Sequence, residues 1–286
     1  MSHKANKMLV LMSDFGTRER FVASMKGVAL GVDEDLKLFD LTHDIEPYNI
    51  WEAAQTLAGT VPYWPAGTVF VAVVDPGVGT DRRSVVAQTR SGCYIVSPDN
   101  GTLTLVAQQD SIVAVREIDE RTNRRPGSSG AHTFHGRDVY AYTGARLAAG
   151  LITFEEVGPL LSTDLVQLPY ENPEVTEAGV IVGTVIKIEH PFGNIVTDIP
   201  GTFLERLSLN PELMPRVEVT IDHGGTVAWS DAIPYAKSFG FVGKGEPLLY
   251  VDSVGQVGIA LNTGDFSGMF GIQAGPAWRV ELKLND

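Results

Sequence analysis

The sequence is poor in several features that would assign it to a particular class of protein. Cys93 is the single cysteine among 286 residues, so an intrachain disulfide and a cysteine zinc cage are both excluded. The longest apolar runs, such as 68–74, fall far short of the ~20 residues of a membrane span. Lysine and arginine form no cluster, and 22 basic against 35 acidic residues give a net charge of −13. This charge argues against nucleic-acid or anionic-lipid partners but tolerates a cationic small molecule.

The N-terminal residues, 1–7, are polar and basic, and no long apolar stretch follows them. No signal peptide is visible, and we expect a soluble cytoplasmic protein. Hydrophobic residues make up 44% of the chain and charged residues 20%, so the chain can bury a real core. The length of 286 residues favours two domains.

The first half of the sequence alternates short apolar runs with segments of helical spacing. This alternation predicts an α/β fold with a largely parallel sheet flanked by helices. We expect strands at 8–12, 36–41 and 68–74, with the sheet extended by 84–88, 93–96 and 112–115. We expect helices at 21–30, 51–58 and 138–149, the last ended by Gly150.

A polar stretch with two prolines, 169–177, separates this N-terminal α/β domain, 1–168, from the rest of the chain. Residues 178–286 are β-prone and punctuated by glycine and asparagine, with helical spacing only at 202–207. We therefore predict a linker followed by a smaller C-terminal domain, built as an antiparallel sheet or small barrel.

Acidic residues follow three of the predicted strands. Asp14 follows the first strand, the run 42–44 the second, and Asp75 the third. A single aspartate in such a place often only caps the next helix. Ligands of parallel α/β sheets, however, bind beyond the carboxyl ends of the strands. Three acidic strand ends together favour a site at this edge.

The loop 75–83 combines two glycines, a proline and two arginines. Its glycines would let the backbone approach a ligand, and an arginine could hold a carboxylate through two hydrogen bonds. The same composition is typical of a tight turn with a solvated charged tip. The loop lacks the lysine and serine or threonine that end a phosphate-binding loop.

Two further motifs leave alternatives open. His132 and His135 precede a predicted helix. They suit metal ligands beside Asp14 or Asp75, one of them suits a general acid/base histidine, and both suit surface histidines at a helix cap. The segment 189–194 has excellent turn chemistry, and its aromatic and amide side chains would also suit a purine.

Taken together, six segments resemble one family. They occur in the order and spacing found in the S-adenosyl-L-methionine (SAM) hydroxide adenosyltransferases, relatives of fluorinase and chlorinase. The resemblance runs from about residue 8 to the C-terminus and rests on 13–16, 41–45, 74–80, 97–101, 134–138 and 190–194. It implies that water or hydroxide displaces L-methionine from the 5′ carbon of SAM and leaves adenosine, without a metal or other cofactor.

The resemblance also implies roles for individual residues. Asp75, Arg82 and His135 match the family's catalytic triad. Asp14 matches the aspartate that grips the ribose hydroxyls, and Tyr48 an aromatic beside the sugar and methionine. The remaining substrate-binding matches are Asn194 for adenine, Phe192 and Tyr235 as aromatic surface for the base, Asn262 for the adenine edge, Ser253 for the methionine carboxylate and Glu189 for the methionine ammonium. Glu189 replaces an aspartate of the halogenating relatives, and Val254 replaces an arginine.

Three other functions compete with hydrolysis. Halogenating relatives carry tyrosine in place of Asp75, and an aspartate would repel a halide, so hydrolysis is favoured over a chlorinase- or fluorinase-like reaction. A non-catalytic adenosine or SAM binder would not need the triad. A metallohydrolase would use His43, His132 and His135 with the strand-end aspartates. Family resemblance further implies a homotrimer whose sites are shared between neighbouring subunits.

Overall fold

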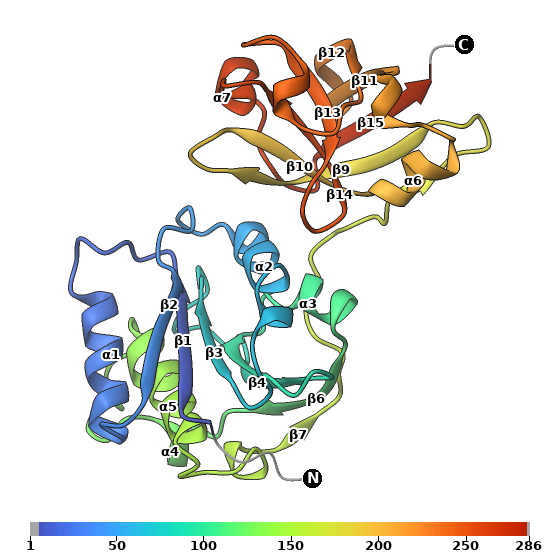
Figure 1. Cartoon of the computed structure of the whole chain (residues 1–286). Helices are drawn as coiled ribbons and strands as arrows, with labels where there is room; N and C mark the ends of the chain where they lie inside the picture. The colour runs from blue at the N-terminus through green and yellow to red at the C-terminus, as the bar shows by residue number, and fades with distance from the viewer. Residues whose placement is uncertain (1–5, 285–286) are drawn as a thin grey trace. The chain divides into compact units, whose positions relative to one another are not determined.

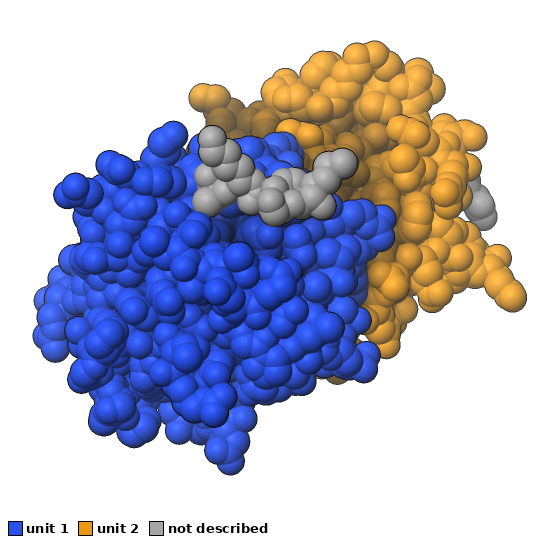
Figure 2. Space-filling view, turned by 90° about the horizontal axis from the view of Figure 1, so that it is seen from below, with its two compact units in different colours: residues 1–168 blue, residues 169–286 orange. Residues whose placement is uncertain are grey.

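The computed structural model describes residues 6–284, and the chain divides into two compact units (Figures 1 and 2). Unit 1 comprises residues 1–168 and unit 2 residues 169–286. No helix within the described part of the chain is long and apolar enough to cross a membrane.

Unit 1 is built on a seven-stranded sheet in the order β2-β1-β3-β5-β4-β6-β7. The four strands β2, β1, β3 and β5 are parallel to one another, whereas β4, β6 and β7 add antiparallel pairs. The predicted α/β class with a largely parallel sheet is thus confirmed. The strands are β1 (Met8–Ser13), β2 (Lys37–Thr42), β3 (Val69–Val73), β4 (Ser84–Thr89), β5 (Tyr94–Pro98), β6 (Ile112–Glu117) and β7 (Leu160–Leu161).

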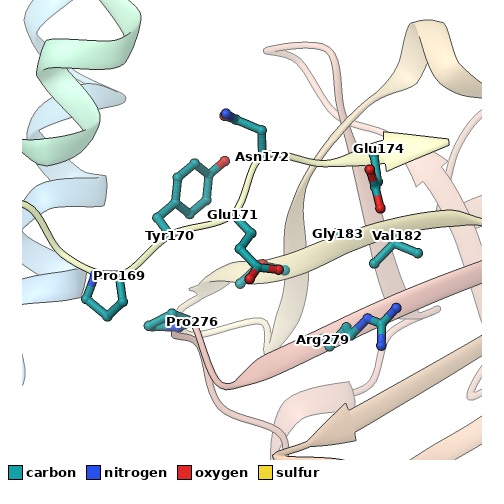
Figure 3. Close-up of a pocket in the computed structure, with 10 residues that line it drawn as sticks. Pro169, Tyr170, Glu171, Asn172, Glu174, Val182, Gly183, Pro276 and Arg279 are labelled. Carbon is teal, nitrogen blue, oxygen red and sulfur yellow. The ribbon is translucent and has the colours of Figure 1, made fainter. Parts of the chain in front are cut away.

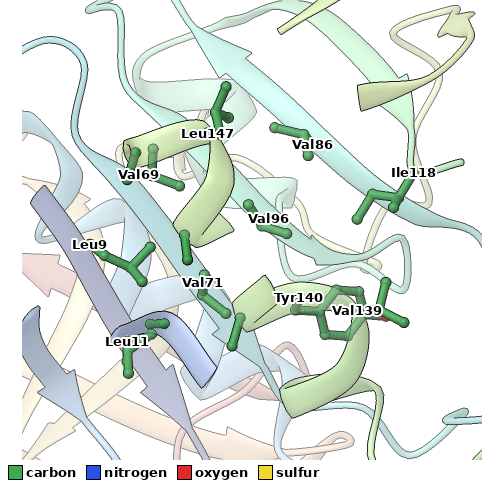
Figure 4. Close-up of a cluster of buried hydrophobic side chains, with 14 of the residues drawn as sticks. Leu9, Leu11, Val69, Val71, Val86, Val96, Ile118, Val139, Tyr140 and Leu147 are labelled. Carbon is green, nitrogen blue, oxygen red and sulfur yellow. The ribbon is translucent and has the colours of Figure 1, made fainter. Parts of the chain in front are cut away.

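Helices cover this sheet in two groups. Helix α1 packs with the π-helix η2 and with α5, and α5 in turn contacts β1 and β3, while α2 packs with α3. Strand β3 is buried along its whole length, which explains its uninterrupted apolar sequence. Figure 4 shows the core between β1, β3 and the η2–α5 segment, with Leu9, Val71 and Tyr140 among its side chains. The helical elements are α1 (Phe21–Val32), α2 (Ile50–Ala58), η1 (Val61–Tyr63), α3 (Thr104–Gln109), α4 (Glu120–Asn123), η2 (Gly136–Ala141), α5 (Tyr142–Ala148) and η3 (Glu155–Val157).

The single helix expected at 138–149 differs in the structure. It begins with one π-helical stretch, Gly136–Ala141, and only then continues as α5. Glycines hold this segment tightly on the sheet: a Cβ at Gly144 would lie 2.6 Å from the side chain of Val71. Single π turns are rare in proteins as a whole, but those that occur are often found at functional sites. Here the π-helix follows His135 directly.

Unit 2 is an antiparallel sheet in the order β12-β11-β15-β9-β10-β14-β13, with β8 paired to β9. A bridge between Tyr235 and Leu249 joins the two ends of this order. The sheet is therefore nearly closed, and the expected barrel-like C-terminal domain is confirmed. Its strands are β8 (Glu174–Val175), β9 (Ile181–Glu189), β10 (Asn194–Pro200), β11 (Arg216–His223), β12 (Thr226–Pro234), β13 (Pro247–Val251), β14 (Gln256–Leu261) and β15 (Trp278–Leu284).

Short helices lie between these strands: α6 (Gly201–Arg206), η4 (Pro211–Leu213), η5 (Phe239–Phe241) and α7 (Phe266–Phe270). Alternating side chains of β11 point inward, and Val217, Val219 and Ile221 are fully buried in the core of the unit. Strand β8 lies within the stretch 169–177 that the sequence suggests as a linker.

Candidate active site

The carboxyl ends of β1 and β3 place Asp14 and Asp75 at one edge of the unit 1 sheet. These strands are parallel neighbours, with Ser13 opposite Val73. Asp14 Oδ2 accepts a hydrogen bond of 2.9 Å from the backbone N–H of Tyr48. Tyr48 has a φ of +69°, rare for a bulky residue, and is 71% exposed. Strained backbone of this kind clusters at functional sites. Here the strained residue is hydrogen-bonded to Asp14, so two of the predicted substrate-binding residues are in contact.

The loop 75–83 folds back and brings Arg82 against Asp75. Arg82 Nε donates to Asp75 Oδ1 at 2.9 Å, and Nη2 donates to Oδ2 at 2.5 Å. Gly79 makes the turn possible, with a φ of +79° and no room for a Cβ, which would lie 2.7 Å from the carbonyl oxygen of His132. The two side chains are only 11% and 4% exposed. The loop therefore holds a buried ion pair between Arg82 and Asp75, and the Arg82 side chain is directed inward.

Both ring nitrogens of His135 lie against arginine side chains. Nδ1 is 3.0 Å from Arg82 Nη2, and Nε2 is 3.1 Å from Arg124 Nη2. Burial lowers the pKa of the His135 imidazole below its usual value, and the two arginines act in the same direction. His132, the other histidine of the motif, is exposed. The structure thus joins Asp75, Arg82 and His135 in one continuous set of contacts.

Two residues absent from the sequence-based candidates complete this network. Tyr140 Oη lies 3.3 Å from Asp75 Oδ2 and 3.2 Å from Ser84 Oγ, and Ser84 accepts a hydrogen bond of 2.8 Å from Arg82 Nη1. Burial raises the pKa of Tyr140, so its hydroxyl stays protonated and can donate to the carboxylate. The π-helix after His135 sets the direction of Tyr140, and nothing in the sequence spacing indicates it.

His43, a buried histidine outside this network, is used by other contacts. His43 Nδ1 lies 2.7 Å from Ser13 Oγ, and its Nε2 lies 3.1 Å from Asp40 Oδ1. Among residues 6–284, no group of three or more His, Cys, Asp or Glu side chains is placed to hold a metal ion. The histidine pairing that a metallohydrolase would need is therefore not assembled by His43 and His135.

In unit 2, a pocket of about 730 Å³ gathers four of the predicted substrate-binding residues. They are Glu189, Phe192, Asn194 and Asn262. Asn194 Nδ2 donates to Glu189 Oε2 at 3.1 Å, and Phe192 is 66% exposed, so its ring is free to cover a ligand. Asn262 Nδ2 donates to the carbonyl oxygen of Val242 at 2.7 Å and fixes the chain beside the pocket.

The segment 189–194, which lines this pocket, forms the turn between β9 and β10, and this explains its many turn residues. Gly193 has a φ of +69°, and a Cβ there would lie 1.8 Å from Asp265 Oδ1. The turn therefore lies so close to Asp265 that only glycine, which has no Cβ, fits at this position. Turn chemistry, one of the alternatives that the sequence left open, is present in this segment, and the same segment also lines the pocket.

Two predicted residues do not line this pocket. Tyr235 is 6% exposed and packs in the hydrophobic core of unit 2, while Ser253 lies exposed in the turn between β13 and β14. Phe239 and Asp265 line the pocket and were not among the sequence-based candidates. The only sequence feature at Phe239 is a run of two aromatics around a glycine, 239–241, which by itself indicates no ligand.

A second pocket of unit 2 has a similar volume, about 720 Å³, and contains none of the predicted site residues. Figure 3 shows its lining, with Tyr170 and Glu171 from the entering chain, Glu174 from β8 and Arg279 from β15.

Comparison with known proteins identifies the family. The family model described as SAM hydroxide adenosyltransferase N-terminal domain matches residues 9–158, and the corresponding C-terminal domain model matches 183–279. The chain belongs to the SAM hydroxide adenosyltransferase family. The resemblance inferred from the sequence is thereby confirmed.

Named relatives of this family member fall into two groups. A protein of Salinispora tropica named (R)-S-adenosyl-L-methionine hydrolase is 37% identical over 94% of this chain and 95% of its own length. One of the same name from Methanocaldococcus jannaschii is 39% identical, over 67% of this chain and 66% of that protein. A fluorinase from an Actinoplanes species is 28% identical over 96% of this chain and 97% of its own.

The fold of the family is also present among solved structures. An uncharacterized conserved protein from Thermotoga maritima superimposes with a TM-score of 0.86 at 33% identity, over 96% of this chain and 100% of that one. The two-unit architecture of this chain is therefore shared along nearly its whole length.

Proposed function

We propose that this protein hydrolyses SAM at the ribose 5′ carbon and releases adenosine and L-methionine. The observation that carries the proposal is the buried contact set of Asp75, Arg82 and His135 in a chain of this family. Relatives named as SAM hydrolases at 34–39% identity support water as the nucleophile. No metal or organic cofactor is required by the chemistry.

The reaction makes modest demands on the protein. The oxygen of water forms a bond to C5′, the C5′–S bond breaks, and the electron pair stays on sulfur. Methionine therefore leaves as a neutral thioether and needs no acid. The enzyme has to orient one water, exclude others and accept one proton. We assign the orientation to Asp75 and Arg82, and the proton to the neutral imidazole of His135.

Substrate contacts are divided between the two units in this proposal. Asp14 has Oδ1 available for the ribose hydroxyls, because Oδ2 is bound to the Tyr48 amide. In unit 2, Phe192 would cover the adenine ring and Asn194 would bind its edge, with Asn262 beside them. Glu189 would meet the methionine ammonium, and Ser253 its carboxylate. Tyr235 would act through the packing of the unit rather than by touching the base.

One experiment tests the reaction directly. The purified protein is incubated with SAM in water enriched in ¹⁸O, and the products are analysed by mass spectrometry. Adenosine and methionine should form in equal amounts, with the label in the 5′ hydroxyl. Label absent from adenosine would rule out attack of water at that carbon.

The same assay separates the competing functions. With chloride or fluoride present, a halogenated adenosine as the main product would favour the fluorinase-like reaction. Binding of SAM without any product would favour a non-catalytic binder. Loss of activity on adding a strong chelator, restored by a metal ion, would favour a metallohydrolase. We expect none of these three results.

The assembly is part of the same proposal. Because the residues assigned to the substrate come from both units, a site shared between subunits of a homotrimer would bring them together. A cytoplasmic location and the absence of nucleic-acid and membrane partners likewise remain predictions from the sequence.

A further inference from the structure

The imidazole of His135 has an unusual pair of neighbours. Arg82 Nη2 approaches Nδ1 at 3.0 Å, and Arg124 Nη2 approaches Nε2 at 3.1 Å. A guanidinium group can only donate hydrogen bonds, whereas a neutral imidazole has one nitrogen that accepts and one that carries a proton. Only one of the two arginines can therefore donate to the ring at a time, and an imidazolium could accept from neither.

Arg124 is held in this position by contacts that do not involve His135. It follows α4 directly, and its Nε donates to Glu120 Oε2 at 3.1 Å while Nη1 donates to the carbonyl oxygen of Ala131 at 3.3 Å. Its side chain is 10% exposed. The preceding residue, Asn123, is 1% exposed and donates to the carbonyl oxygens of Glu156 and Val157. The end of α4, from which the Arg124 side chain projects, is thus fixed by the hydrogen bonds of Asn123.

Four charged groups surround the ring. Asp75 and Arg82 belong to the loop 75–83, while Glu120 and Arg124 belong to α4 and its C-terminal end. The two carboxylates favour a protonated ring, and the two arginines disfavour it. Each carboxylate is paired with one of the two arginines. The guanidinium groups are therefore the charged groups in direct contact with the ring.

We propose that Arg124 is a positioning residue for the hydrolysis, which fixes the ring of His135 and keeps its imidazole neutral before SAM is attacked. This inference rests on the proposed function, because only a neutral ring can accept the proton of the attacking water. It also gives a purpose to a charged segment, 120–125, that no other part of the mechanism uses. A ring held between two cations gives up a proton more readily, which favours the return of His135 to its neutral form after each turnover.

The test compares two substitutions of similar length, one that keeps the positive charge and one that is neutral. Arg124→Lys keeps a cation beside the ring, and Arg124→Met keeps the bulk without the charge. The titration of His135 is followed by NMR of the imidazole Cε1–H signal, which is assigned as the one missing from His135→Gln. We expect the His135 pKa to rise in Arg124→Met and to stay near the wild-type value in Arg124→Lys. Arg121→Met, at an 89% exposed position of the same helix, is the control and should not move it.

Turnover gives the second measurement. We expect Arg124→Met to lower kcat by roughly 10- to 100-fold, as for the loss of a hydrogen bond to a charged group, with little change in KM. The acid limb of its kcat profile should move to higher pH, in step with the NMR titration. Arg124→Lys should recover part of the turnover.

The two proposals fail in different ways. An unchanged His135 pKa in folded Arg124→Met would overturn the role of Arg124, whatever reaction the protein catalyses. Equal pKa values in the Lys and Met variants would also overturn it, because burial and not charge would then control the ring. Wild-type protein that forms no adenosine from SAM would instead overturn the hydrolysis and leave the NMR comparison valid.

Discussion

Arg82 engages both carboxylate oxygens of Asp75, Nε with Oδ1 at 2.9 Å and Nη2 with Oδ2 at 2.5 Å, and the same Nη2 reaches His135. This arrangement fixes the guanidinium plane, because two parallel hydrogen bonds leave it no freedom to rotate. Arg82 is therefore a rigid connection between the carboxylate and the imidazole. A water molecule bound at this point would meet a carboxylate, a cation and a neutral base that hold fixed positions before substrate arrives.

The first prediction concerns His135. His135→Gln should lower kcat by roughly 10²–10⁴-fold, the usual contribution of a positioned general base, while the Kd for SAM changes little. Because burial lowers the pKa of His135, the wild-type kcat should be level at neutral pH and fall only below the ordinary histidine value of about 6.5. Steady-state kinetics from pH 5 to 9 and calorimetric binding give the two quantities.

A matched control for this variant is His132→Gln, because His132 belongs to the same sequence motif but is exposed. It should leave kcat unchanged. Normal turnover in a folded His135→Gln variant would remove His135 from the mechanism and leave Asp75 and Arg82 to orient the water alone.

A second prediction concerns the pocket of unit 2. Phe192→Ala should weaken binding of adenosine by roughly 5- to 150-fold, since stacking of one base on an aromatic ring contributes ~1–3 kcal/mol. The control is Phe241→Ala, a 53% exposed aromatic that does not line the pocket. Calorimetric titration with adenosine measures both. Equal affinities in the two variants would place the base elsewhere.

Much of this site could be predicted from the sequence because its residues fall in a few short, dense motifs. The loop 75–83 and the motif around His135 carry dense, unusual chemistry, and the strand before the loop is an uninterrupted apolar run. The placement of Asp14 and Asp75 at one edge then follows from the topology, since the strands that precede them, β1 and β3, are parallel neighbours. The fold class followed from the same alternation of strands and helices.

The parts that were missed depend on contacts distant in sequence. The π turn at Gly136–Ala141 arises where glycines meet the sheet, and it directs Tyr140 toward Asp75, 65 residues away. Arg124 lies among several charged residues with no periodicity, so nothing singled it out. The family resemblance implied Tyr235 as aromatic surface for the base, and the structure places its ring in the hydrophobic core of unit 2.

A third prediction concerns the stability of unit 2. Burial raises the pKa of Asp198 to about 6, against the hydrogen bonds it receives from the Thr184 amide and the Tyr170 hydroxyl. The folded protein therefore binds this proton more tightly than the unfolded chain. The free energy of unfolding therefore falls as the pH rises from about 4 to about 6, because the buried Asp198 carboxyl is forced to ionise. Above about pH 6 the protein carries the full free-energy cost of the buried charge.

Asp198→Asn should remove this cost. At pH 8 we expect the variant to raise the free energy of unfolding by an amount of the order of 1–3 kcal/mol, given ~1.4 kcal/mol for each pKa unit. At pH 4 the advantage should disappear. Thermal unfolding at both pH values measures it, with the exposed Asp231→Asn as control. A lower melting temperature for Asp198→Asn at pH 8 would show that the carboxylate is stabilised by its surroundings.

The last prediction tests whether each site draws on two subunits. Asp14→Ala removes a proposed ribose contact in unit 1, and Asn194→Ala removes a proposed adenine contact in unit 2. Each variant alone should bind SAM weakly. If a site combines unit 1 of one chain with unit 2 of another, mixed trimers contain some sites in which both residues are intact. Mixing the variants under conditions of subunit exchange should therefore restore part of the activity. Exchange is verified by native mass spectrometry of differently tagged chains. Exchange without recovered activity would place both units of a site in one chain, and a monomeric mass would exclude the trimer itself.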